Sequence, residues 1–201
     1  MKAILRRAFV RASLAAVLLP ALASAQAPHV RGVVEKLEGD VLTLKLASGK
    51  SERVQLAKDW TVTVLKRVDV SAIQPGSFIG TAEMPQANGT GRSLEVHVFP
   101  PGVKAGEGHY AWDLRKGSMM TNGTVGQVTS SPKGQELEVS YPNGQRHMVV
   151  PKGVPIVQFS NGDQSLVKPG TPVFLIVAKS PSGELSAGGV AVGENGAKPP
   201  M

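Results

Sequence analysis

The sequence predicts an all-β protein made of two small closed β-barrels that follow one another along the chain and are joined by an irregular connector. Three observations support this prediction. Short runs alternate between apolar and polar residues, as half-buried strands do. No window after residue 25 carries apolar residues at helical spacing. The same order of strands and turns also recurs at an offset of 91 to 95 residues.

The first 25 residues have the three parts of a secretory signal peptide. A basic start without acidic residues precedes an apolar stretch that is too short to span a bilayer. Small residues, Ala23 and Ala25, stand where signal peptidase reads the chain, so we predict cleavage after Ala25 and a periplasmic protein. The pair Arg6-Arg7 leaves the twin-arginine route open beside the Sec route, which we favour.

Removing this segment changes the charge. Four of the 22 basic residues lie in it against none of the 15 acidic ones, so the formal net charge falls from +7 to +3. With 4% aromatic residues and no dense basic block, we exclude a nucleic-acid partner. No segment after the signal is long and apolar enough to span a membrane. The absence of cysteine excludes disulfides, thiolate metal sites and a cysteine nucleophile.

The first predicted barrel covers residues 29–99. Residues 41–46 alternate, with three leucines on one face, and Ser48-Gly49 then predicts a turn. Further strands are predicted at 53–56, 61–64 and 93–98. In the last of these, we expect Leu94, Val96 and Val98 to face the core.

The second predicted barrel covers residues 123–193 and repeats this order. Residues 122–125 correspond to 31–34, and 136–141 correspond to 41–46. Each copy then has a Pro-Gly pair, Pro75-Gly76 and Pro169-Gly170, followed by a strand. We interpret this as a tandem duplication of a unit of about 70 residues.

A unit of five or six short strands suits a small OB-like, Greek-key barrel, because closure removes the unpaired edges of an open sheet. Gly32 and Gly123, which open the first strand of each copy, are typical of a tight bend where one strand serves both sides of a barrel. A pair of β-sandwiches remains the alternative.

The chain resembles a family of exported bacterial proteins that are built from small OB-like barrels and belong to a domain family of unknown function. The pattern is a Gly-x-Val opening, a Leu-x-Leu strand and an x-Gly turn. It is carried by Gly32, Val33, Leu42, Leu44 and Gly49, and again by Gly123, Val125, Leu137 and Gly144. The resemblance covers most of residues 29–193. It implies a fold and an exported location, and no reaction.

The connector, residues 100–122, concentrates the rare residues in a Gly-His-x-x-Trp-Asp motif. A close subgroup of the family looks similar here. One hypothesis is a copper or zinc site that combines nitrogen, oxygen and thioether ligands. Its candidate ligands are Glu107, His109, Asp113, Met119 and Met120.

The other hypothesis, which we favour, is a shaped connector. Trp112 and Leu114 would then pack between the barrels, while Asp113 and Ser118 bond to local backbone. Three further histidines, His29, His97 and His147, are expected to be solvated, with His97 on the outer face of its strand. Residues 194–201 are expected to form a flexible tail.

No catalytic motif is recognisable, so we expect a protein without enzymatic activity. Two barrels and a connector offer a concave junction for a ligand or a partner. The sequence therefore predicts a periplasmic binding or accessory protein, with a link to metal handling and an envelope protein or metal-transport component as partner. The alternative is a structural or envelope-interaction protein without a small ligand.

Overall fold

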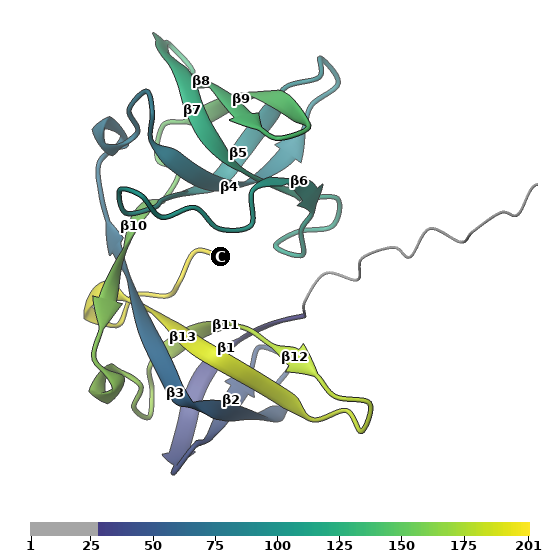
Figure 1. The fold of residues 1–201 in the computed structure, drawn as a ribbon, viewed down its shortest axis with the longest axis vertical. Coiled ribbons are helices and arrows are strands. Elements are labelled where there is room, and N and C mark those ends of the chain that lie inside the picture. Colours follow the sequence, from purple (N-terminus) through teal and green to yellow (C-terminus); the bar gives the residue numbers. More distant parts are fainter. Residues whose placement is uncertain (1–27) are drawn as a thin grey trace, which may run out of the picture.

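The computed structural model describes residues 28–201, which form an all-β protein, as predicted (Figure 1). The predicted signal peptide lies outside these residues, as does its cleavage site, and both stay predictions. The strands are β1 (His29–Glu38), β2 (Val41–Leu46), β3 (Ser51–Arg67), β4 (Phe78–Pro85), β5 (Gly91–Val98), β6 (Gly108–Ala111), β7 (Met119–Ser131), β8 (Gly134–Tyr141), β9 (Gly144–Pro151), β10 (Ile156–Gly162), β11 (Pro172–Ile176), β12 (Ala178–Lys179) and β13 (Leu185–Gly193). Three 3-10 helices are η1 (Val70–Ala72), η2 (Gln164–Leu166) and η3 (Glu194–Gly196).

Five strands close into a barrel in the order β1-β2-β3-β13-β11, with β11 pairing back onto β1. All of these pairs are antiparallel except β3–β13, which is parallel. The barrel encloses a core of branched apolar side chains that includes Leu42, Leu44, Val54, Val173 and Val190. Leu42 and Leu44 are fully buried, as the alternation of residues 41–46 predicts.

The strands β7-β8-β9-β5-β4 form a second cycle of pairings, because β4 pairs back onto β7. Its one parallel contact joins β5 to β9. Ile79, Val96, Leu137, Val139 and Met148 lie in the core of this second ring. Figure 1 shows the two rings one above the other.

The predicted ranges 29–99 and 123–193 do not coincide with the rings. The first ring combines residues 29–67 with residues 172–193, whereas all five strands of the second ring lie within residues 78–151, between β3 and β10. The reason is the length of β3. Its 17 residues span roughly 55 Å when extended, and its second half pairs with β10. After β3 the chain continues into β4 and β5 of the other ring. After β10 it returns to β11 and β13 of the first ring, as Figure 1 shows.

Two segments differ from the prediction. The connector is only partly irregular, because residues 108–111 form β6, which pairs with residues 119–122 of β7. The tail at 194–201 was expected to be flexible, yet it packs against the protein, and Met201 is only 8% exposed. Apolar burial of this side chain is what holds the tail in place. Within residues 28–201, no helix has the length and apolar character needed to cross a bilayer.

A methyl group at Gly123 of β7 is expected to destabilise the protein. A Cβ there would lie 2.4 Å from the Ser140 carbonyl oxygen on the neighbouring strand, so the backbones would have to move apart. We expect Gly123→Ala to lower the free energy of unfolding in urea by about 1–3 kcal/mol. The control is Gly126→Ala in the same strand, where the nearest atom would be 3.7 Å away. Equal destabilisation by both variants would contradict the packing.

Candidate binding cavity between the rings

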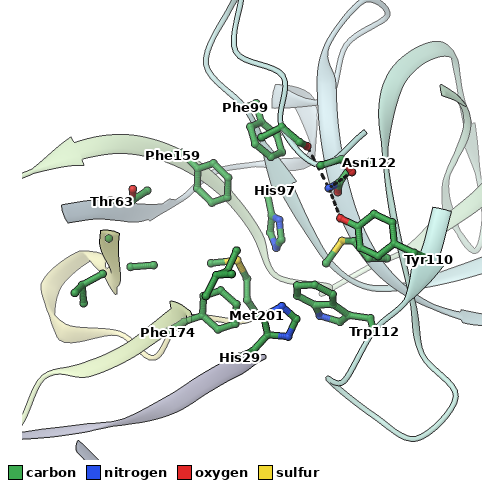
Figure 2. A pocket seen from close by; sticks show the side chains of 17 residues that line it. His29, Thr63, His97, Phe99, Tyr110, Trp112, Asn122, Phe159, Phe174 and Met201 are labelled. Atoms are coloured by element: carbon green, nitrogen blue, oxygen red, sulfur yellow. Dashed lines mark hydrogen bonds between the residues drawn. The ribbon is translucent and has the colours of Figure 1, made fainter. Parts of the chain in front are cut away.

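A cavity of about 530 Å³ lies between the two rings. Five of the eight Phe, Tyr and Trp residues in residues 28–201 line it, and none of its lining residues is Asp, Glu, Lys or Arg. Figure 2 shows these side chains converging from both rings and from the connector. The aromatic members are Phe99, Tyr110, Trp112, Phe159 and Phe174.

The wall from the second ring is formed by side chains that lie side by side on four strands. The register places Gly80 of β4 between His97 of β5 and Asn122 of β7. A Cβ at Gly80 would lie 2.4 Å from the Asn122 amide oxygen and 3.2 Å from His97 Nδ1. Glycine at this position therefore allows the two polar side chains to approach each other over β4.

Asn122 fixes the connector to this wall. Its amide nitrogen donates to the Gly106 carbonyl at 2.9 Å and to the Tyr110 hydroxyl at 2.9 Å (Figure 2). Gly106 has φ +59°, and a Cβ there would lie within 3 Å of both side chains. The Asn122 amide oxygen is buried without a hydrogen-bond partner. Burial also raises the pKa of the Tyr110 phenol, which keeps it a neutral donor.

The wall from the first ring is joined to the connector by aromatic contacts and an ion pair. The rings of His29 and Trp112 are 4.2 Å apart, and those of His29 and Phe174 are 5.6 Å apart. Asp113 accepts two hydrogen bonds from Arg31 of β1, at 2.7 and 3.1 Å. Burial acts to raise the pKa of Asp113, but Arg31 and His29 outweigh it and lower that pKa. Asp113 thus bonds to a distant strand rather than to local backbone.

Ser118 behaves as the connector hypothesis predicts. Its hydroxyl donates to the carbonyl oxygens of Trp112 and Arg115, at 3.0 and 2.8 Å, and so closes the turn that carries Trp112 into the cavity wall. The indole N–H of Trp112 is buried and has no hydrogen-bond partner within residues 28–201. Buried donors are normally paired, so this unpaired indole donor is an exception in the wall of the cavity.

A second polar cluster lies on the inner side of β4. Glu83 is fully buried, and its carboxylate accepts a hydrogen bond from Arg146 at 2.9 Å. Burial raises the pKa of Glu83, and Arg146 partly opposes the shift. His109 lies 3.8 Å from the same carboxylate oxygen and 2.8 Å from the Thr121 hydroxyl. Burial and the nearby Arg146 together lower the pKa of His109.

A buried carboxylate also supports the cavity wall at His97. Glu95 accepts a hydrogen bond from the Ala82 amide at 3.0 Å and contacts His97 Nε2. Both side chains are almost fully buried, so the expectation that His97 is solvated is wrong. His29 is also buried, with 5% of its side chain exposed, because the connector covers the outer faces of β1 and β5. His147, at 39%, is partly exposed.

The predicted metal ligands are not gathered at one point. His109 faces Glu83, Asp113 faces Arg31, and Glu107 lies exposed in its loop. Met119 and Met120 are consecutive in β7 and therefore point to opposite faces, with Met120 in the cavity wall. In residues 28–201, no group of three or more His, Asp or Glu side chains has the arrangement of a metal site.

Of the residues predicted to pack the connector, Trp112 lies between the rings, whereas Leu114 borders a neighbouring groove. Several residues of the site carry no signal in the sequence. Phe99, Phe159 and Phe174 come from three separate segments, and the pairing of β10 with both rings brings them together. Glu95 gave one local hint, because it shares a strand face with His97.

Comparisons with known proteins return no match: no protein-family model, no curated protein and no solved structure is similar to this chain. The resemblance to an exported domain family of unknown function therefore stays a prediction.

The partly buried His109 is expected to weaken the fold in acid. Its pKa is lowered from the usual 6.5. The unfolded chain consequently binds a proton as the pH falls through about 6.5, whereas the folded protein does not, and stability is lost. His109→Gln should reduce the loss of melting temperature between pH 7 and pH 5. Melting at pH 8, where the imidazole is neutral in both states, serves as the reference. An unchanged loss would contradict the prediction.

Proposed function

We propose that this protein is a periplasmic, non-enzymatic binding module that takes an uncharged, mainly apolar ligand into the cavity between its rings. One observation carries the proposal. Aromatic side chains are scarce in the chain, at 4%, yet five of them line one cavity without a charged lysine, arginine or carboxylate among the lining residues. A cavity of about 530 Å³ is in the range typical of small-ligand sites.

The polar groups of the site support a ligand with one or two hydrogen-bonding atoms. Trp112 has an unpaired indole donor, and Asn122 has an unpaired amide acceptor, both buried. A buried polar group without a partner costs free energy, about 1–3 kcal/mol. A bound molecule that supplied an acceptor for Trp112 or a donor for Asn122 would recover part of that cost. This requirement selects against a pure hydrocarbon.

Binding of N-phenylnaphthylamine, an uncharged fluorescent probe, tests the proposal. The variant Trp60→Phe leaves Trp112 as the sole tryptophan of the chain, and Trp60 belongs to the core of the first ring rather than to the cavity. We expect this variant to bind the probe with quenching of Trp112 fluorescence. Trp112→Ala should bind at least tenfold more weakly, which corresponds to about 1.4 kcal/mol.

Thermal unfolding of both variants checks that they are folded. Equal binding by Trp112→Ala and Trp60→Phe would place the probe elsewhere and contradict the proposal. An absence of binding to the unmodified protein would favour the structural or envelope-interaction role. Native mass spectrometry of the periplasmic protein adds a second test, because a stoichiometric copper or zinc ion that is lost in His109→Ala would favour metal handling.

We also infer that the chain arose by duplication of one OB-like unit, with two strands of each copy exchanged. The support is the matching register. Gly32 pairs with Val173 on β11, and Gly123 pairs with Ile79 on β4, so each copy's first strand meets the strand that follows the Pro-Gly pair of the other copy. Each ring also has one parallel pair, β3–β13 or β5–β9. The exported family described above remains the family we propose.

A further inference from the structure

The end of the chain, residues 198–201, lies in a groove beside the aromatic cavity. Met201 packs against Leu65, Val157 and Phe174, and Pro199 is buried. A main-chain oxygen of Met201 accepts a hydrogen bond from Arg31 Nε at 2.7 Å. Met201 lines both the groove and the cavity, so it lies where the two spaces adjoin. Figure 2 shows its side chain among those of the cavity.

This segment is held by few interactions. Among the hydrogen bonds of residues 28–201, the one from Arg31 is the single bond that reaches residues 198–201. Pro199 and Pro200 have no N–H to donate, so the segment cannot join the sheet as a regular strand. Elements with few hydrogen bonds and few apolar contacts open at the lowest free energy. The segment is therefore the part of the wall that a competing molecule can displace.

We propose that the groove and the cavity together bind an extended peptide with a Pro-Pro pair followed by an unbranched apolar residue, and that residues 198–201 are a tethered occupant of this site. The inference rests on the proposed binding function and specifies its ligand. The chain's own segment shows the chemistry the site accepts: a buried proline, a buried apolar side chain and a main-chain oxygen on Arg31.

The groove fits such a peptide for two reasons. Proline pairs hold the extended polyproline conformation before binding, so little chain entropy is lost when they dock on an apolar, aromatic-lined surface. Arg31 is also fixed in place, because Asp113 accepts two hydrogen bonds from its guanidinium and the ring of Phe174 lies 5.1 Å from it. A guanidinium held in a fixed position favours a ligand that offers a main-chain oxygen, as a peptide does.

Tethering makes the segment compete with an added peptide. A short tether gives an effective concentration on the order of millimolar. A free peptide of the same sequence therefore binds the unmodified protein weakly, and Met201→Gly should unmask the site. Because the cavity continues beyond the Met201 side chain, the incoming residue has room to enter it.

The test is titration calorimetry of Met201→Gly with acetyl-Lys-Pro-Pro-Met-amide. We expect measurable binding that is at least tenfold stronger than binding of the same peptide to the unmodified protein. A matched peptide with glycine in place of methionine should bind at least tenfold more weakly. In parallel, N-phenylnaphthylamine is titrated into the same variant to report the cavity itself.

The outcomes separate the two proposals. If the probe binds and the methionine peptide does not, the peptide assignment is overturned and the proposed function stands. If neither the probe nor the methionine peptide binds, both the peptide assignment and the proposed function are overturned. Equal binding of the two peptides would also overturn the assignment, because the side chain would not be recognised. A dimer of the unmodified protein that disappears in Met201→Gly would show that the groove takes a second copy's tail instead.

A measurement on the unmodified protein keeps the inference testable if the variant is unstable. The Met201 side chain belongs to a cluster with Phe174 and Trp112, and we expect their ring currents to shift its methyl NMR signal. Excess methionine peptide should move this signal to the position of a solvent-exposed methionine. A signal that stays in place at saturating peptide would count against displacement.

Discussion

The pairing of β10 with one strand of each ring is the constraint on which the rest of the structure depends. β3 begins in one ring and ends against β10, and β10 also pairs with β5 of the other ring. The first ring is closed by β11 and β13, which follow the second ring in the chain. Separating the rings would break the pairing of β10 with β3 or with β5, so the space between them is a fixed feature of the fold. This distinguishes the protein from two barrels on a flexible linker.

The connector turns this space into a defined cavity. β6 adds one strand to the outside of the second ring, and its alternation sends Tyr110 toward the cavity and His109 toward Glu83. Arg31 and Asp113 then tie the connector to the first ring. The Gly-His-x-x-Trp-Asp motif therefore forms part of the cavity wall and contacts both rings.

Buried charged side chains lie beside this wall and are not among the residues that line the cavity. Glu83 and Glu95 are both fully buried on neighbouring strands, and each contacts a cationic or ionisable partner, Arg146 or His97. Buried carboxylates are costly unless they are paired. These pairs link β4 and β5 to neighbouring strands and residues beside the cavity.

The sequence by itself determined the all-β class and the buried faces of the strands, because alternation with period two is a local property of each segment. Leu42 and Leu44 show this, and so does the role of Ser118, which bonds to residues close to it in the chain. The exposure of His97 was wrongly predicted, since the alternation places it outward but cannot show what covers that outer face. Only the tertiary structure decided which strands close which ring, and with them the cavity. Phe99, Phe159 and Phe174 lie together because β3 pairs with β10 between the two rings. No local sequence pattern encodes that long-range choice of pairing partner.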